Sequence, residues 1–465
     1  MLIVLSDLHF AEAETSHLGR LSVNHNLPSI VYKAFFREIA EFIRDDNVKT
    51  VDIVLAGDIF EINRSGFWLV DSLRPYVNNS QVEADPALER RVLEILDAIA
   101  REPRVSETLL LFRQLPELFK RPVRVHYIPG NHDRLTNASP KIRRRIQSFL
   151  GLELSDEKFN PQYVHYVHGD ALILVRHGHE YDPSNFSLNL RKSASIPALI
   201  DPEAYEKPVV GDIITVEIAS KIPKLFKEYY SEETILSIDE LVLIYRRLND
   251  FDNVRPPEAI LNFLFSTPGL TQKEVWRFIE PVFMKALDDI ALDGNIGRSL
   301  IQWGGIVGFA AFMTRLLLKS RFWKRGIPFW LIKILLTPAS RKSGEDIDIK
   351  IVQKEEVVQD PGSSIRCVVS GHTHTAKVAL LDVRDGEEIY YLNSGTFRNV
   401  ISATPDLSEF GRTRSKARVL IFEPGERNPD YVRKTGWSFD VVAKYSFGSE
   451  LTESPDQELA NEDLQ

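Results

Sequence analysis

A single turn organises this sequence: Tyr127-Ile128-Pro129-Gly130-Asn131-His132-Asp133-Arg134. The residues before it, Val123–Ile128, are β-branched and aromatic enough to form a buried strand, and the Pro-Gly pair would stop that strand. The turn then offers an amide oxygen, an imidazole and a carboxylate. Ligands bind at the carboxyl ends of strands in open α/β sheets, so this stretch has the position of an active-site loop. Taken alone it is weak evidence, because Asn, His and Asp are also ordinary turn residues.

The length and composition of the chain limit the number of domains and the class of protein that it can represent. The chain has 465 residues, enough for one large elaborated domain or for two to three domains. Its 43% hydrophobic and 26% charged residues are typical of a soluble globular protein. The formal net charge of -9 argues against a protein that binds nucleic acid through overall basicity, although a local basic surface remains possible.

Cysteine usage and the N-terminus both favour a location on the cytoplasmic side. The single cysteine, Cys367, excludes an intramolecular disulfide and suits a reducing compartment. Its apolar neighbours indicate a packing role, not a nucleophile. The apolar start, residues 1–5, is too short for a signal peptide.

Two further strands in the first sixty residues end in polar side chains. Residues 2–6 form an apolar run that leads into Asp7-Leu8-His9, and residues i and i+2 share a face in extended backbone. After a helical pattern over residues 30–44, the run 51–56 ends in Gly57-Asp58. The glycine allows a tight turn that leaves the Asp58 carboxylate exposed at its tip. Asp58 could bridge two cations.

Further along, two helical patterns at residues 86–101 and 105–120 precede the strand at 123–128. Residues 163–167 and 171–176 form a predicted hairpin in which His168 is a turn residue. His177 is the first polar residue past the second strand and is the better ligand candidate. His17 and His25, in an expected loop over residues 11–28, receive no role.

The second half of the chain changes character twice. Residues 186–345 are predominantly helical in pattern and are predicted to be an insertion between a first core segment, 1–185, and a second, 346–447. Strand signals return at 365–370, just before Gly371-His372-Thr373-His374. Further strand-like runs follow at 376–382, 388–393, 417–422 and 437–443. Residues 448–465 are acidic and polar, which predicts a disordered tail.

Five polar groups therefore follow apolar strands in this order: Asp7-x-His9, Gly57-Asp58, Gly130-Asn131-His132-Asp133, His177 and Gly371-His372-x-His374. This ordered set resembles the motifs of the calcineurin-like metallophosphoesterase superfamily. The resemblance covers about residues 1–182 and 346–445 and does not extend to the insertion. It implies an α/β (α+β) fold: a four-layer core of two packed mixed β-sheets flanked by helices, with a large helical insertion.

The resemblance also implies a dinuclear metal centre. Two divalent cations about 3.5–4 Å apart supply a nucleophile near neutral pH and offset the charge on phosphate oxygens. A hydroxide shared by the two ions is the expected nucleophile. Imidazole and oxygen ligands suit Mn, Fe, Zn or Ni better than calcium, and Mn is the first expectation. By resemblance one ion takes Asp7, His9 and His374, the other takes Asn131, His177 and His372, and Asp58 bridges them.

The resemblance also implies a catalytic role for two residues. His132 is expected to protonate the leaving oxygen or stabilise its charge, and Asp133 is expected to orient it; the alternative is that both only shape the turn. A second phosphate could be held by Arg134, Arg176 or Arg398, although a solvated arginine is an equal alternative at each position.

Several stretches also resemble the UDP-2,3-diacylglucosamine hydrolase branch, whose members cleave a pyrophosphate in lipid A assembly. They are Leu55–Glu61, the hairpin before His177, and Asn393-Ser394-Gly395-Thr396. That branch has arginine where this chain has His132, and it lacks an insertion of this size. The expected activity is therefore hydrolysis of a phosphodiester or pyrophosphate bond in a nucleotide-linked or lipid-linked substrate.

Two alternatives belong to other functional classes. A nuclease resembling the DNA-repair members would need a basic groove near the motifs. An inactive scaffold would show eroded metal ligands, and none is missing here.

One part of the insertion is strongly basic, although the chain as a whole has a net negative charge. Residues 295–344 contain nine basic side chains and no Asp or Glu, interleaved with aromatic and aliphatic residues. Cations beside aromatic rings suit an interfacial segment on an anionic membrane surface, on the inner face of the membrane. A full span is less expected, because only sixteen uncharged residues separate Arg298 from Arg315. A helical lid on the core is an equal alternative, and nucleic acid is a weaker one.

Overall fold

The computed structural model describes residues 1–12, 17–18, 21–22, 25–256, 259–292, 347–427 and 437–447. The predicted membrane-docking stretch 295–344 and the predicted tail 448–465 lie outside these residues. No helix in the described part of the chain is both long enough and apolar enough to cross a bilayer.

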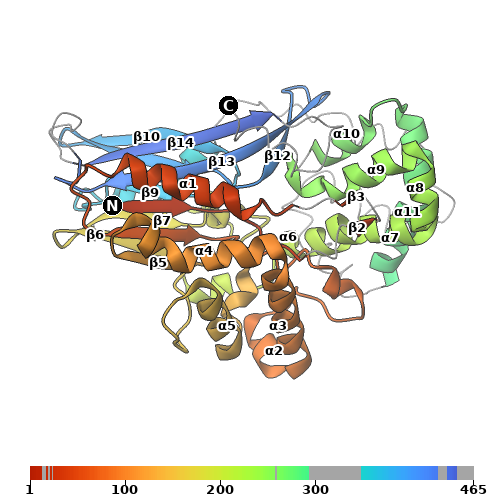
Figure 1. The fold of residues 1–465 in the computed structure, drawn as a ribbon, viewed down its shortest axis with the longest axis horizontal. Coiled ribbons are helices and arrows are strands. Elements are labelled where there is room, and N and C mark those ends of the chain that lie inside the picture. Colours follow the sequence, from red (N-terminus) through yellow and green to blue (C-terminus); the bar gives the residue numbers. More distant parts are fainter. Residues whose placement is uncertain are drawn as a thin grey trace.

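Two mixed β-sheets form the centre of the molecule (Figure 1). In the first, β5, β4 and β1 run parallel, and β13 then joins β1 in the antiparallel direction. β12 pairs with β13, and β8 closes the edge beside β12, while β14 also pairs with β13. The strands of this sheet are β5 (Val123–Ile128), β4 (Val51–Ala56), β1 (Leu2–Leu5), β13 (Phe410–Phe422), β12 (Asn399–Ala403), β8 (Val254–Arg255) and β14 (Ser438–Phe447).

The second sheet has five strands, of which β11, β9 and β7 are parallel. The outer strands β10 and β6 are each joined to a neighbour by a hairpin. In sheet order they are β10 (Ala376–Arg384), β11 (Glu387–Ser394), β9 (Cys367–Ser370), β7 (Asp170–Arg176) and β6 (Gln162–Val167).

Side chains that alternate along the strands build the layers. In β1, Ile3 and Leu5 face a helix-covered core, whereas Leu2 and Val4 face the second sheet. Cys367 is fully buried between the sheets, as predicted, and burial raises the pKa of its thiol. Helices cover the outer face of each sheet, so the predicted four-layer α/β fold is confirmed.

The helices over the first sheet agree with the predicted periodicity. The pattern at 30–44 is α1, and those at 86–101 and 105–120 are α3 and α4, which begin at prolines after the capping side chains of Asp85 and Glu102. The expected loop over 11–28 contains two antiparallel strands of two residues each, β2 (His17–Leu18) and β3 (Leu21–Ser22). The helices of this layer are α1 (Ser29–Phe42), α2 (Asn79–Ala84), α3 (Pro86–Arg101), α4 (Pro103–Phe119) and α5 (Pro140–Leu150).

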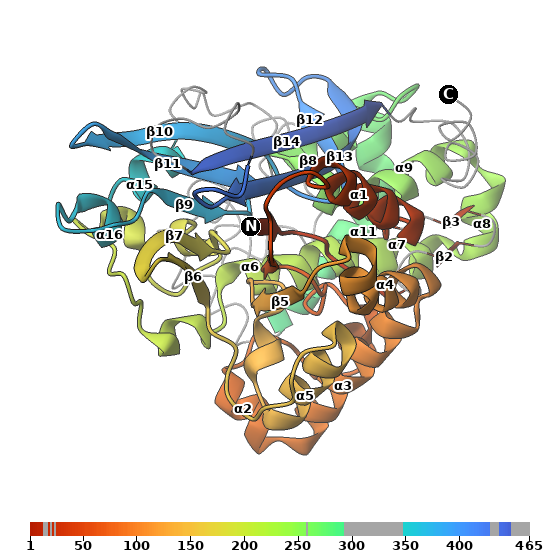
Figure 2. The same cartoon turned by 60° about the vertical axis from the view of Figure 1, so that its left-hand side comes forward.

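The described part of the insertion is mostly helical and packs around its own apolar core, which includes Phe226, Leu248 and Trp276. Figures 1 and 2 show these helices gathered at one end of the sheets, beside β12. The insertion also supplies β8, which pairs with β12 and was not predicted from the sequence, as β12 was not. Its helices are α6 (Val210–Ile214), α7 (Lys221–Tyr230), α8 (Glu232–Ser237), α9 (Asp239–Asn249), α10 (Ile260–Phe265) and α11 (Gln272–Leu292).

The two ends of the insertion are joined to each other. Ile196 forms a parallel bridge with Glu355, and its backbone exchanges hydrogen bonds of 2.7 Å with Lys354 and Glu356. Two short helices, α15 (Ile347–Val352) and α16 (Glu356–Gln359), lie on the returning chain and pack on the second sheet. The chain therefore leaves and re-enters the core at one place.

Candidate active site

The predicted site residues come together because their strands end side by side. β1, β4 and β5 are parallel neighbours in the first sheet, and β7 and β9 are parallel neighbours in the second. The polar residues follow the carboxyl end of each strand. The loops after five strands therefore meet between the two sheets.

The first cluster consists of Asp7, His9 and His374. His374 Nε2 lies 3.2 Å from Asp7 Oδ1 and 3.1 Å from His9 Nε2. All three side chains are buried. One divalent cation would be surrounded by one oxygen and two nitrogen donors here, which are ordinary ligands of transition metals.

The second cluster consists of Asp58, His177 and His372. Asp58 Oδ2 lies 3.1 Å from His177 Nε2 and 3.9 Å from His9 Nε2 of the first cluster. The carboxylate therefore stands between the two clusters. Asn131 is also buried, and its amide nitrogen donates to Asn185 over 3.4 Å, which leaves the amide oxygen available.

Three of the predicted ligand atoms are buried and form no hydrogen bond of acceptable geometry with the described residues, although the first and last lie 3.2 and 3.1 Å from another candidate ligand: Asp7 Oδ1, Asn131 Oδ1 and His177 Nε2. Buried polar atoms are nearly always satisfied, so three orphaned atoms in one pocket call for a missing partner. Every one of them is a lone-pair donor. The residues present therefore fit divalent cations.

The backbone of these loops is strained where it carries the candidate ligands. Asp7, His9, Asp58, His372 and His374 all have left-handed backbone, with φ between 46° and 68°. Non-glycine residues adopt this conformation at a cost of roughly 1–3 kcal/mol each, and such residues gather at functional sites. The sequence folds this way because each turn must direct a side chain back between the sheets.

At two of the turns, a glycine is needed because any larger residue would overlap the side chain of a candidate ligand. A Cβ on Gly57 would overlap the ring of His177, and a Cβ on Gly130 would overlap the Asp58 carboxylate. Gly57 also has φ +85°. The glycines of the sequence motifs thus make room for the ligand side chains of neighbouring strands.

Residues 1–206 match the family model of the calcineurin-like phosphoesterases. These residues therefore carry a domain of this superfamily. No curated protein matches the chain. The narrower resemblance to the UDP-2,3-diacylglucosamine hydrolase branch stays a prediction. His372 and His374 lie beyond the matched residues, yet β9 brings them to the same edge of the phosphoesterase domain as His177.

Hydrogen bonds fix the orientation of three imidazoles in the candidate site. His177 Nδ1 lies 2.8 Å from the carbonyl oxygen of Ala56, and His9 Nδ1 lies 2.7 Å from Glu61 Oε2. His372 Nε2 lies 3.3 Å from Asp182 Oδ2. Each contact occupies one ring nitrogen; in His177 and His9 the other nitrogen faces the cluster, as is usual for metal-ligating histidines.

Both candidate carboxylate ligands are ionised. Burial alone would raise the pKa of Asp7, but His374 and His9 hold it well below its usual range. Burial opposes ionisation of Asp58 in the same way, and His177 and His132 outweigh it, so its pKa also lies well below normal. The pocket therefore offers charged oxygen donors at neutral pH.

His132 lies beside the clusters, with its ring centroid 4.9 Å from that of His9. Its Nδ1 lies 2.6 Å from Glu61 Oε1, and its backbone N–H donates to Asp58 over 2.8 Å. Burial lowers the pKa of His132, but Glu61 and Asp58 raise it more strongly, to about 10. The ring is thus held in its protonated form by its protein neighbours.

The predicted role of Asp133 in orienting His132 is wrong. Its carboxylate accepts the backbone N–H groups of Asp58, Ile59 and Phe60, that of Gly130, and the Tyr127 hydroxyl. These bonds fasten the loop after β5 to the loop after β4. Glu61 instead binds the His132 ring.

Two of the three arginines predicted as phosphate ligands are structural. Arg134 donates to the backbone carbonyls of Pro75, Val77 and Glu206 and to the Asp212 carboxylate. Arg176 is fully buried and pairs with Glu355, with Nε 3.2 Å from Oε1. Neither guanidinium is free to hold a substrate. Arg398 is different, because it lies buried near Asp7 and Glu61.

Sequence reasoning assigned no role to Glu61, Asp182 and Arg255. Glu61 and Asp182 stand at the ends of the predicted motif stretches, so their position was a usable signal. Arg255 comes from β8 in the insertion, and its Nη2 lies 2.6 Å from His374 Nδ1. No local pattern marks it, because its place depends on pairing between β8 and β12.

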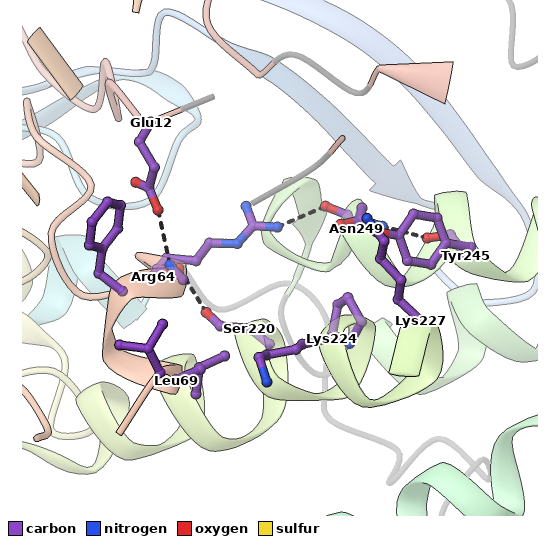
Figure 3. Close-up of a pocket in the computed structure, with 13 residues that line it drawn as sticks. Glu12, Arg64, Leu69, Ser220, Lys224, Lys227, Tyr245 and Asn249 are labelled. Atoms are coloured by element: carbon purple, nitrogen blue, oxygen red, sulfur yellow. Dashed lines mark hydrogen bonds between the residues drawn. The ribbon is translucent and has the colours of Figure 1, made fainter. Parts of the chain in front are cut away.

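A separate cavity of about 250 Å³ lies between the core and the insertion (Figure 3). It is lined on the core side by Glu12, Arg64 and Leu69, and on the insertion side by helices α7 and α9. Arg64 extends toward Asn249 and donates to its carbonyl oxygen over 2.8 Å. Glu12 accepts from Ser65 and Gly66. None of the candidate metal ligands lines this cavity.

Proposed function

We propose that this chain is a dinuclear metal-dependent phosphoesterase that hydrolyses a phosphodiester or pyrophosphate bond. One observation carries the proposal: the Asp58 carboxylate stands between two clusters, 3.1 Å from His177 of one and 3.9 Å from His9 of the other. A carboxylate in this position can bridge two cations. The phosphoesterase domain supports the same reaction class.

The candidate ligands divide between two cations as the clusters do. Asp7, His9 and His374 would hold one, and His177, His372 and the Asn131 oxygen the other. When bound, the cations would supply a nucleophile near neutral pH and neutralise charge on the phosphate. Mixed nitrogen and oxygen donors favour Mn, Fe, Zn or Ni, and we propose Mn as the physiological choice.

His132 and Glu61 would act on the leaving group. His132 is less buried than the cluster residues, with its side chain 18% exposed, and Glu61 holds its Nδ1. The other ring nitrogen can therefore present a proton to the leaving oxygen. Glu61 also binds His9, so one carboxylate positions both the acid and a candidate ligand.

The activity can be tested with the purified chain on bis(4-nitrophenyl) phosphate. We expect no turnover after chelation, and recovery on adding Mn, with lower activity for Zn, Ni or Fe. Asp58→Asn should abolish turnover and reduce bound metal from two equivalents to one or none by elemental analysis. Asp45→Asn, an exposed control in the turn that follows α1, should behave as wild type.

The result that would overturn the proposal is no hydrolysis with any of these metals. Two bound equivalents without turnover would favour the inactive scaffold. Cleavage of DNA in preference to small diesters would favour the nuclease. We propose a nucleotide-linked or lipid-linked phosphate as the natural substrate, which a panel of both kinds would test.

A further inference from the structure

Arg398 is a buried cation that has no partner among the described residues. Its exposed fraction is 3%, and no hydrogen bond or ion pair joins its guanidinium to any residue that the structure describes. Removing an arginine from water without a counter-charge is costly, so buried arginines are normally paired. Among the charges that act on the guanidinium, Asp252 is the strongest, followed by Arg64, Glu61 and Asp7, which places it beside the candidate metal site. An anion from outside the protein would satisfy it.

His25 is a second unsatisfied group in the same place. Its Nε2 is buried and has no hydrogen-bond partner within the described part of the chain. Burial, with the charges of Arg64 and Arg398, lowers the pKa of His25 to about 3. The neutral ring can still donate one N–H. The loop before α1 thus contributes a hydrogen-bond donor next to Arg398.

Arg255 reaches the same region from the insertion. Its Nη1 donates to the carbonyl oxygens of Asp252 and Val254, over 2.7 and 2.9 Å. Its Nη2 lies against His374, 2.6 Å from Nδ1 and 3.1 Å from Nε2. An imidazole that ligates a cation through one nitrogen carries a proton on the other, so it cannot accept from Arg255. Cation binding would therefore free this Nη2 for another acceptor.

Two of the three arginines in this region form no ion pair with a carboxylate of the described residues. Arg64, Arg255 and Arg398 act on one another or on Asp252 electrostatically. The Asp252 carboxylate is already paired with Arg64, whose other amino group binds Asn249 (Figure 3). Arg255 and Arg398 are left without a carboxylate of their own. Asp7 acts electrostatically on both of these guanidinium groups, so they lie next to the Asp7 cluster.

We propose that Arg398, Arg255 and His25 bind a second phosphate group of the substrate, beside the phosphate that is hydrolysed. This inference rests on the proposed phosphoesterase function and narrows it to substrates that carry two phosphate groups close together. Guanidinium groups bind phosphate oxygens with two parallel hydrogen bonds, and two arginines with one imidazole N–H suit a dianionic group. The insertion thereby contributes to substrate selection through Arg255.

The test compares two anions as inhibitors of bis(4-nitrophenyl) phosphate hydrolysis, with free Mn held constant. Phosphate has one phosphorus, and methylenediphosphonate is a stable molecule with two. Arg398→Met should weaken inhibition by methylenediphosphonate about 10- to 100-fold, the size expected for lost charged hydrogen bonds, and inhibition by phosphate much less. Arg398→Lys should fall between wild type and Arg398→Met. Arg90→Met, an exposed arginine of α3, controls for the loss of one charge.

Binding measured by calorimetry separates the two proposals. If Arg398→Met weakens both anions equally, Arg398 holds the hydrolysed phosphate, and the second-phosphate site is wrong while the phosphoesterase function stands. If no metal supports hydrolysis but methylenediphosphonate still binds through Arg398, the function fails and the anion site stands. Arg398→Met should also keep the melting temperature of wild type, because it breaks no hydrogen bond within the described structure. A large drop would show a structural role and overturn the inference.

Discussion

The phosphoesterase core and the insertion reach the same pocket with different chemistry. The core supplies every candidate metal ligand, on strained turns whose side chains are fixed by neighbours such as Ala56 and Glu61. The described insertion supplies supporting groups instead: Asp212 holds Asn63 and Arg134, and Arg255 brings a positive charge to His374. The core therefore carries the residues that we propose for hydrolysis, whereas the insertion contributes residues that we propose for substrate recognition.

This division has a physical basis. Metal ligands must be placed to within a fraction of an ångström, and the ends of neighbouring parallel strands in a sheet provide that rigidity. A group that binds a second phosphate tolerates a longer, more adaptable side chain. Variants in the core should therefore affect turnover and metal binding, whereas variants in the insertion should affect substrate preference.

The largest effect should come from His132→Ala in the core. If His132 is the acid, turnover should fall on the order of 10²–10⁴-fold for a substrate with a poor leaving group. The loss should be smaller for a nitrophenol leaving group, which needs no proton. Bound metal should remain near wild type. Rates for a series of aryl and alkyl esters measure this, and an equal loss across the series would remove the acid role.

Glu61→Gln should affect both turnover and metal binding, because Glu61 contacts both His132 and His9. The amide keeps the shape but loses the charge that favours a protonated His132. We expect lower turnover together with weaker metal binding, whereas His132→Ala should affect turnover alone. Glu61→Gln with unchanged metal affinity would mean that His9 needs no support from this side chain.

The next effect concerns the connection between the two regions. Glu355 is fully buried with Arg176, close to where the insertion begins and ends. Glu355→Ala would leave a buried guanidinium without its carboxylate and should lower the free energy of unfolding by about 3–5 kcal/mol. Urea denaturation followed by circular dichroism measures this change.

The matched control for that change removes both charges. Arg176→Met combined with Glu355→Met should recover most of the stability, because it leaves no unpaired buried charge. Both variants should unfold in a single transition if core and insertion are one cooperative unit. Two separate transitions would instead show that the regions are energetically independent.

A smaller effect is expected at Asp182, whose carboxylate lies 3.3 Å from His372 Nε2. Asp182→Asn should weaken metal affinity roughly 10- to 100-fold, the usual cost of losing a group that orients a ligating histidine. Titration with Mn or Zn measures it directly. Asp170→Asn, at an exposed hairpin position, serves as the control. Unchanged affinity in Asp182→Asn would show that His372 is oriented by its own turn.

Much of the core could be predicted because its signals are local. Apolar strands broken by glycine or proline gave the strand ends, and helical spacing gave α1, α3 and α4 within a few residues. Strand β8 has only two residues and β12 only five, too few for periodicity to detect. The position of Arg255 depends on that pairing, so it could not be read from its neighbours in sequence.

The interpretation of Asp133 failed for a different reason. It assumed that an acid next to His132 in sequence would contact its ring. Successive residues of a tight turn point in different directions, and the carboxylate of Asp133 turns inward to the loop after β4. Glu61, 71 residues away from His132 in sequence, occupies the position beside the ring. Contacts across neighbouring strand ends are visible only once the sheet order is known.

The smallest effect on turnover should come from the basic stretch 295–344, which we propose docks on an anionic membrane surface. Its nine basic residues and no acidic ones contrast with the net charge of -9 for the whole chain. Each basic residue near an anionic surface contributes about 1 kcal/mol, and salt screens this attraction. The chain should therefore sediment with liposomes that contain anionic lipid, and less so as salt rises.

The variant that tests this docking replaces Trp323, Lys324, Arg325 and Trp330 together. It should lose sedimentation while hydrolysing a small soluble diester at the wild-type rate, because the candidate ligands all lie in the core. A lid over the pocket predicts the reverse, with no sedimentation on any lipid and a changed rate on the soluble diester. A docking role and a lid role are thus separated by one variant and two assays, and the outcome decides whether the insertion selects the substrate by charge alone or also by bringing the enzyme to a surface.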